Sequence, residues 1–358
     1  MKKLLIFCIA VTFLSCEKDD DGFTNDCNID TINSKINGGS ILQTWVFASS
    51  NGKEETTIAQ KTNANWVSLS PIIGIKDIST QGLSYKYDFR VRDQVDKMKV
   101  IIPKMSNSGL QNVMLKPITQ FGSVPVNYSY SGFWGDFYVE TEEEWLEVER
   151  AYAELFYEFA KLSEEFPEVK LLSIGTELKE FTKRRPQFFK VLIAKIRTDF
   201  PNLKLTYAAN WDEYQSVSFW EELDYIGVNP YFPLSDKKEP TLDEIKDAFV
   251  PIKNSLNNLS CIYSKPILFT EYGFRSSDYG LWKSWLKEFY YDKAVNFEIQ
   301  NNAYTAFYDS FWDEDWVAGG FFWEWRILIN GEVNNPNGNG WYINDKPVEN
   351  IIKELYAK

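Results

Sequence analysis

Histidine is absent from this sequence of 358 residues. Its absence excludes Ser-His-Asp and Cys-His nucleophilic catalysis, histidine-ligated zinc and proton relays through imidazole. Cysteine is scarce, and the four cysteines show no CxxC spacing that would indicate a metal site or a redox pair. We therefore expect chemistry by Glu, Asp, Tyr, Lys or Cys side chains, with no metal and no cofactor.

Positive charge is also in short supply. The chain has 38 Lys and Arg residues against 51 Asp and Glu residues, a formal net charge of -13. Nucleic-acid binding requires a basic surface that neutralises phosphates, so this balance argues against it. It favours a neutral or cationic partner.

Apolar runs long enough to cross a membrane are missing as well. The longest one near the N-terminus, residues 4–14, is too short for a spanning helix. It follows Lys2 and Lys3 and ends at Leu-Ser-Cys16, so residues 1–15 resemble a bacterial lipoprotein signal peptide. This resemblance implies acylation of Cys16. An ordinary cleaved signal that contains a cysteine is the alternative.

The polar residues that follow predict a flexible tether over 16–38. We expect the chain to be secreted across the inner membrane and lipid-anchored to the cell envelope, in the periplasm or at the cell surface, with no membrane attachment besides the anchor. A disulfide between Cys27 and Cys261 is possible, but the sequence does not decide it.

Aromatic residues, in contrast, make up 16% of the chain. This exceeds what a core alone requires, and surplus Trp and Tyr suit flat sugar faces or a protein interface. The segment 121–139 is rich in Gly, Tyr and Ser and contains Trp134. Its length and composition predict a functional loop.

Strands alternate with helices along the rest of the chain. We predict strands at 42–48, 65–71, 112–117, 171–175, 204–208, 225–228, 266–271 and 317–323. We predict helices at 88–108, 145–166, 186–200, 241–259, 297–312 and 346–356, with short ones between the first two strands and near 219. Eight such units predict a closed (β/α)8 TIM barrel, an α/β fold, as a single catalytic domain over 39–358. An open doubly wound sheet is the alternative, although no GxGxxG turn follows the first strand.

Glu177 ends the apolar run of the fourth predicted strand. Desolvation at such a strand end raises the pKa of a carboxyl group toward neutrality, as a general acid requires. Stabilisation of Glu177 at a helix N-terminus is an equally simple explanation.

Polar and aromatic residues follow the other predicted strands, at the barrel end where such enzymes have their active sites. These rim residues are Lys116, Asn210, Trp211, Asp212, Asn229, Tyr231, Glu271, Tyr272, Trp323, Glu324 and Trp325. Glu177 and Glu271 occupy corresponding places on opposite strands, and glycoside hydrolysis uses two such facing carboxyl groups. The aromatic rings would stack on sugars, and Lys116 and Asn210 would bind hydroxyls.

Two other functions account for the aromatic residues. A non-catalytic glycan-binding lipoprotein needs the rings but not both carboxylates. A protein-interaction module gives no reason for paired Glu residues at strand ends. The catalytic interpretation uses both features.

Four sequence runs resemble glycoside hydrolase family 113: IGTELKEF, LTYAANWDEY continuing to FWEELDYIGVNPYFPL, ILFTEYGF, and GGFFWEW with NGWYINDKPVENIIKELY. The resemblance implies a clan A barrel and a retaining, two-glutamate double-displacement mechanism. By motif position Glu177 corresponds to the acid/base and Glu271 to the nucleophile. Ile118 replaces a His that is typical after Lys-Pro, and residues 51–62 look like an insertion.

The expected activity is therefore that of an endo-β-1,4-mannanase-like enzyme acting on a polysaccharide or oligosaccharide. Lys116, Trp134, Asn210, Trp211, Asn229, Tyr231, Tyr272, Trp323 and Trp325 are the expected substrate-binding residues. We expect a monomer.

Overall fold

The computed structural model describes residues 29, 32, 34–42, 57–79, 82–85, 90–121, 133–286, 289–326 and 338–358. The predicted signal peptide, Cys16 and most of the predicted strand 42–48 lie outside these residues, as does much of the loop 121–139. Within them, no helix is both long and apolar enough to cross a membrane.

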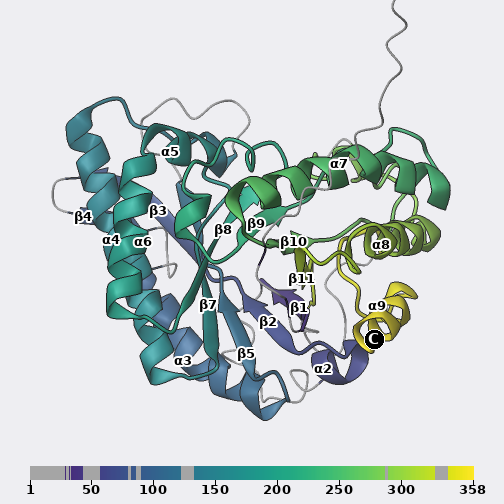
Figure 1. Ribbon diagram of the computed structural model, residues 1–358, viewed down its shortest axis with the longest axis horizontal. Coiled ribbons are helices and arrows are strands. Elements are labelled where there is room, and N and C mark those ends of the chain that lie inside the picture. Colours follow the sequence, from purple (N-terminus) through teal and green to yellow (C-terminus); the bar gives the residue numbers. More distant parts are fainter. Residues whose placement is uncertain are drawn as a thin grey trace, which may run out of the picture.

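Eight parallel strands close into a barrel, which confirms the predicted single-domain (β/α)8 fold (Figure 1). In chain order they are β1 (Ile36–Ile41), β2 (Trp66–Leu69), β5 (Asn112–Leu115), β7 (Val169–Thr176), β8 (Lys204–Asn210), β9 (Ile226–Asn229), β10 (Ile267–Tyr272) and β11 (Val317–Phe322). β1 pairs with both β2 and β11 and so closes the barrel.

Helices surround the strands. They are α2 (Thr57–Thr62), α3 (Val91–Asn107), α4 (Glu142–Glu165), α5 (Lys179–Arg184), α6 (Pro186–Asp199), α7 (Leu242–Tyr263), α8 (Phe297–Phe311) and α9 (Val348–Tyr356), with 3-10 turns η1 (Trp134–Asp136) and η2 (Trp220–Glu222). α4 begins at a capping box formed by Thr141 and Glu144, and Pro186 occupies the first turn of α6. Cys261 in α7 is disulfide-bonded, and the other three cysteines lie outside the described residues.

The first barrel strand begins earlier than predicted. β1 starts at Ile36, so residues 36–38 belong to the barrel and not to the tether. The sequence INGGSI has little strand propensity, because glycine has no side chain to pack. The structure requires these glycines: a Cβ on Gly38 would lie 2.2 Å from the Phe321 ring, and one on Gly39 2.4 Å from the Phe322 ring.

A second sheet was not predicted. It has three strands in the order β4 (Gly82–Tyr85), β3 (Ile72–Ser79), β6 (Ile118–Phe121). β3 and β6 follow barrel strands β2 and β5 after a few residues and pair in parallel. Ile118, the residue that departs from the family pattern, is buried at the start of β6, opposite Ile72.

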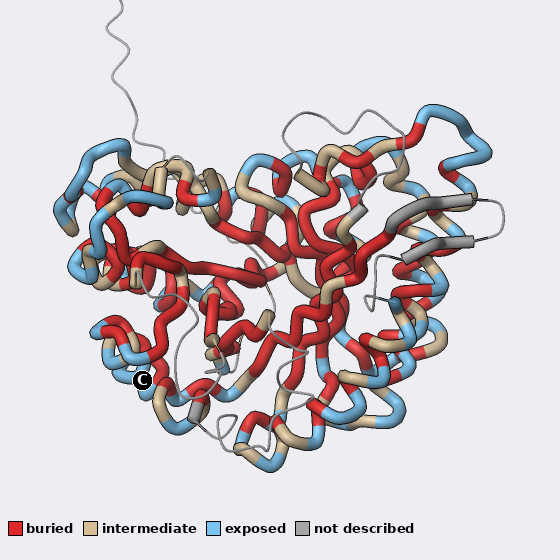
Figure 2. The backbone as a smooth tube through the Cα atoms, turned by 180° about the vertical axis from the view of Figure 1, so that it is seen from behind, coloured by how far each residue is buried: buried red, intermediate tan, exposed pale blue. Residues whose placement is uncertain are grey.

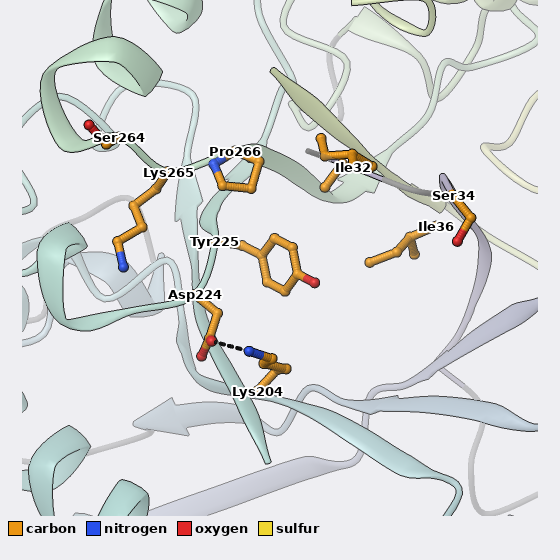
Figure 3. A pocket seen from close by; sticks show the side chains of 10 residues that line it. Ile32, Ser34, Ile36, Lys204, Asp224, Tyr225, Ser264, Lys265 and Pro266 are labelled. Atoms are coloured by element: carbon orange, nitrogen blue, oxygen red, sulfur yellow. Dashed lines mark hydrogen bonds and ion pairs between the residues drawn. The ribbon is translucent and has the colours of Figure 1, made fainter. Parts of the chain in front are cut away.

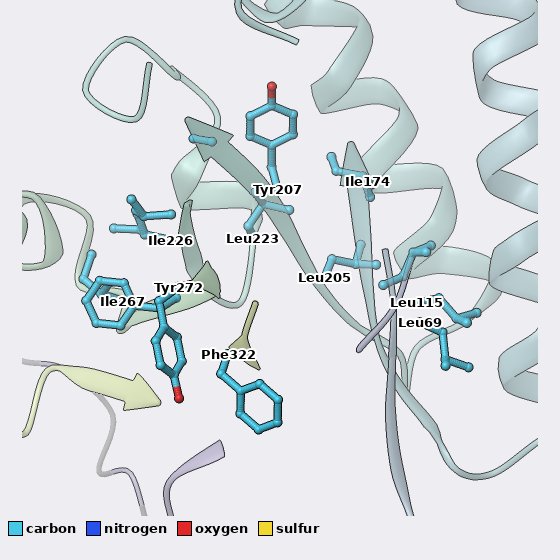
Figure 4. Packing of buried hydrophobic residues seen from close by; sticks show 14 of the residues in the cluster. Leu69, Leu115, Ile174, Leu205, Tyr207, Leu223, Ile226, Ile267, Tyr272 and Phe322 are labelled. Carbon is cyan, nitrogen blue, oxygen red and sulfur yellow. The ribbon is translucent and has the colours of Figure 1, made fainter. Parts of the chain in front are cut away.

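The barrel strands are buried apart from a few residues such as Lys170 and Lys204, and most exposed residues lie on the outer sides of the helices and in loops (Figure 2). Between the barrel and the helices lies one large apolar cluster, part of which is shown in Figure 4. A smaller cluster of Ile36, Met114, Leu171, Leu268, Ala318 and Phe321 fills the barrel interior. Packing thus fixes the strands, and through them the side chains at their ends.

Candidate active site

Glu177 and Glu271 both lie at the carboxyl ends of barrel strands. Glu177 follows the last residue of β7, with a left-handed backbone (φ +55°), and Glu271 is the penultimate residue of β10. Their exposed fractions are 7% and 6%. Burial of two carboxyl groups at one barrel end is costly unless partners stabilise them.

Glu271 has two such partners. The Lys116 ammonium, which is fully buried, forms an ion pair with Oε1, and the Tyr231 hydroxyl donates to Oε2 at 2.8 Å. Both oxygens of Glu271 therefore accept hydrogen bonds, one from a cation.

Glu177 has a different environment. Its Oε1 accepts a hydrogen bond from Asn229 Nδ2 at 3.0 Å, and Asn229 Oδ1 accepts one from Thr270 Oγ1 at 2.7 Å, which orients the amide. Burial, followed by the charge of Glu271, raises the pKa of Glu177 to about 8, against the opposing effects of Asn229 and Lys116. Glu177 therefore retains its proton at neutral pH, whereas both carboxyl oxygens of Glu271 accept hydrogen bonds.

A buried network supports the backbone after Glu177, and no sequence pattern indicated it. The Leu178 amide donates to the Tyr207 hydroxyl at 2.6 Å, and that hydroxyl donates to Glu213 Oε1 at 2.6 Å. Thr182 Oγ1 and the Asn210 amide also donate to Glu213, at 3.0 and 3.1 Å. Burial raises the pKa of Glu213 to about 7.

Several of the expected aromatic residues line the same end of the barrel. The Trp323 ring lies 5.0 Å from the Lys116 ammonium. Trp211 contacts Phe232 and Trp285, with ring centres 6.0 and 5.7 Å apart. Trp285 is 40% exposed and was not predicted, because it lies in a loop without a recognisable pattern.

Trp134 and Asn210 are held by local contacts. Trp134 lies in η1, where its Nε1 is buried and has no hydrogen-bond partner among the described residues. The next residue, Gly135, packs so closely on the backbone that a Cβ there would lie 2.4 Å from the Glu177 carbonyl oxygen. Asn210 is half-buried, and its Oδ1 accepts from the Trp211 amide at 2.8 Å.

Tyr272 and Trp325 were wrongly predicted to bind substrate. Tyr272 is fully buried outside the barrel, where its hydroxyl bonds to those of Tyr308 and Tyr356 (Figure 4). Trp325 is 3% exposed and belongs to the apolar cluster beneath the helices. Tyr272 directly follows Glu271 in β10, and neighbouring residues of a strand point to opposite faces.

The opposite end of the barrel has a cavity of about 290 Å³ (Figure 3). Its lining comes from the starts of the strands, including Lys204, Tyr225 and Ile36. Active sites in this fold lie at the carboxyl ends, so this cavity is not the catalytic one. No cluster of three or more His, Cys, Asp or Glu side chains in the described part of the chain could hold a metal ion.

A barrel with this carboxylate pair is the architecture of a glycoside hydrolase. The sequence matches the model of Glycoside Hydrolase Family 113 over residues 40–346, and the chain belongs to that family. None of the curated proteins matches it.

Solved structures show the same fold. A β-1,4-mannanase of this family, in a complex, is 21% identical with a TM-score of 0.70, covering 91% of this chain and 99% of its own. The β-mannanase from Alicyclobacillus acidocaldarius in complex with ManMIm is 20% identical with a TM-score of 0.68, covering 90% and 97%. A Ruminococcus gnavus β-glucuronidase is more distant, at 16% identity and a TM-score of 0.55, covering 86% of this chain and 46% of its own.

Proposed function

We propose that this glycoside hydrolase cleaves a β-1,4-linked mannan-type polysaccharide internally, with retention of configuration. The observation that carries the mechanism is the contrast between the two glutamates. Glu177 has a pKa raised to about 8, whereas Glu271 accepts hydrogen bonds from Lys116 and Tyr231. Family membership and the mannanases of similar fold support the substrate class.

In the first step the Glu271 carboxylate attacks the anomeric carbon, and the bond to the leaving oxygen breaks. Glu177 gives its proton to that oxygen, so the leaving sugar departs as a neutral alcohol. Glu177 is now a carboxylate and takes a proton from water. The resulting hydroxide attacks the anomeric carbon and releases Glu271, which restores both residues to their starting states.

A second candidate is a non-catalytic glycan-binding protein on the same barrel. It needs the aromatic rings around Trp211 and Trp323 but has no use for two buried carboxyl groups with opposite environments. Hydrolysis of any member of a panel of mannan, glucomannan and other β-glycans would exclude it.

Azide rescue tests the two roles. With an aryl mannoside whose leaving group needs no proton, Glu177→Ala should form the glycosyl-enzyme and then stall, because no base activates water. Azide needs no deprotonation, so it should restore turnover and give a β-glycosyl azide.

Glu271→Ala cannot form the intermediate, so azide should give only the α-glycosyl azide, by direct attack in the vacated space. If Glu177→Ala instead gave the α-glycosyl azide and Glu271→Ala the β-glycosyl azide, the roles of the two glutamates would be the reverse of those proposed. Full activity of either variant on mannan would contradict the mechanism.

A further inference from the structure

Three basic side chains gather on the loops that follow β10 and β11: Arg275, Arg326 and Lys346. Arg326 Nε donates to Glu324 Oε1 at 2.9 Å. Arg275 and Lys346, in contrast, form no ion pair with any carboxylate of the described residues. A local excess of positive charge is unusual in a chain with a net charge of -13.

Arg275 is held in place by its neighbours. Its guanidinium carbon lies 3.5 Å from the centre of the Tyr290 ring and 4.8 Å from that of Trp341, and its Nε donates to the Ser284 carbonyl oxygen at 2.6 Å. The terminal nitrogens donate to no acceptor among the described residues. The group is thus pre-positioned, with hydrogen-bond donors to spare.

Lys346 lies nearby and is 5% exposed. Its ammonium donates to Ser276 Oγ and the Gly340 carbonyl oxygen, both at 2.9 Å, and lies 3.5 Å from the centre of the Tyr342 ring. Burial and the two arginines lower the pKa of Lys346 to about 6, and burial chiefly lowers that of Arg275 to about 10. A bound anion would offset this cost of holding positive charges together.

The basic group is linked to the nucleophile by direct contacts. The Trp341 ring, which contacts the Arg275 guanidinium, also packs against the Tyr231 ring, with the two ring centres 4.7 Å apart. The Tyr231 hydroxyl in turn donates to Glu271. One aromatic ring, that of Trp341, thus separates the Arg275 guanidinium from Tyr231, the hydrogen-bond partner of Glu271.

We propose that Arg275 binds a carboxylate of the substrate, so that the enzyme acts on an acidic β-glycan containing uronic acid residues. A guanidinium edge matches a carboxylate with two parallel hydrogen bonds, and aromatic rings against its faces keep that edge oriented. This proposal rests on the proposed glycosidase function and adds the substrate's charge to it.

Two matched substrates provide the test. One is a neutral β-1,4-manno-oligosaccharide, and the other is the same oligosaccharide with one C6 oxidised to a carboxylate. The wild type should cleave the acidic substrate with a kcat/KM about 10- to 100-fold higher, mainly through KM. The preference should shrink as salt is added.

In Arg275→Gln the ratio of the two kcat/KM values should fall to about one, because the guanidinium-carboxylate bonds are lost. Arg275→Lys should give an intermediate ratio, since it keeps the positive charge but lacks the paired N–H donors of the guanidinium. Arg150→Gln is the matched control: Arg150 pairs with Glu147 and Glu154 on α4, and its loss should leave the ratio unchanged.

Thermal unfolding of each variant checks the fold, and calorimetric binding of both oligosaccharides gives a result independent of turnover. Equal affinity of the wild type for the two substrates, or an undiminished preference in Arg275→Gln, would overturn the proposal. Failure of the glycosidase function itself would look different, because neither substrate would then be hydrolysed although the affinities could still differ.

Discussion

The protonation of Glu177 should set the alkaline limit of activity. Burial and the charge of Glu271 raise its pKa to about 8, so the acid form prevails below that pH and is lost above it. We expect kcat/KM on mannan to fall as pH rises past about 8.

An activated aryl mannoside, whose leaving group needs no proton, provides the control for this prediction. Its kcat/KM in the wild type should show no such fall. An identical alkaline limb with both substrates would assign the titration to another group.

Lys116 should stabilise the fold as well as the nucleophile. Its side chain and that of Glu271 are 0% and 8% exposed, so Lys116→Met would leave a buried carboxylate without its cation. Loss of one partner of a buried pair costs about 3–5 kcal/mol in the free energy of unfolding. Urea denaturation measures this value.

The double variant Lys116→Met with Glu271→Gln removes both charges and should recover a large part of that stability. If the two effects simply add, the ion pair makes no coupled contribution to the fold.

Individual site residues differed in how far the sequence revealed them. Residues directly after apolar strands, such as Lys116, Asn229 and Tyr231, could be placed at the rim because strands end where apolar runs end. Arg275 and Trp285 could not, because they lie in a loop without periodicity whose path depends on tertiary contacts.

At the scale of elements, the junction of β7 and α5 holds Glu177, the proposed acid/base. Glu177 and Leu178 form this junction, and the Leu178 amide donates to the Tyr207 hydroxyl, which is buried together with Glu213. Tyr207→Phe removes that hydroxyl, so the Leu178 amide loses its acceptor and the buried Glu213 keeps only the donors Thr182 and Asn210. We expect a loss of about 1–3 kcal/mol in the free energy of unfolding.

Because Tyr207 contacts no reacting atom in the proposed mechanism, its effect on turnover should arise from the position of Glu177. In Tyr207→Phe, kcat/KM on mannan should therefore fall more than kcat/KM on the activated aryl substrate, whose leaving group needs no proton. Tyr157→Phe is the control, since that hydroxyl bonds to Asp199 on the helical surface. Equal losses of kcat/KM on both substrates would make Tyr207 merely structural.

The predicted bounds of helices and strands were most accurate where several local sequence signals agreed. The helix at Glu142–Glu165 was predicted closely, because its capping box and apolar spacing agree with each other. β1 was missed, because its glycines serve close packing against Phe321 and Phe322. The β4–β3–β6 sheet was missed because its strands come from different loops and pair only in three dimensions.

At the scale of the whole molecule, the excess of acidic residues should keep the enzyme apart from nucleic acids and from anionic polymers in general. The basic group at Arg275 and Lys346 is then a local exception beside the active site. An acidic glycan would be repelled by most of the surface and held at one point, which favours binding in a defined register.

The N-terminal segment should determine the cellular location of the protein. We propose that Cys16 is acylated after removal of residues 1–15, which carry Lys2, Lys3 and a short apolar run as lipoprotein signals do. Cys16→Ala should then shift the protein from the membrane fraction to the soluble fraction after cell lysis. Cys8→Ala is the matched control, because it changes a cysteine in the same segment without touching the acylated position, and that variant should stay with the membranes. Membrane retention of Cys16→Ala would show that the lipid anchor is not at this residue.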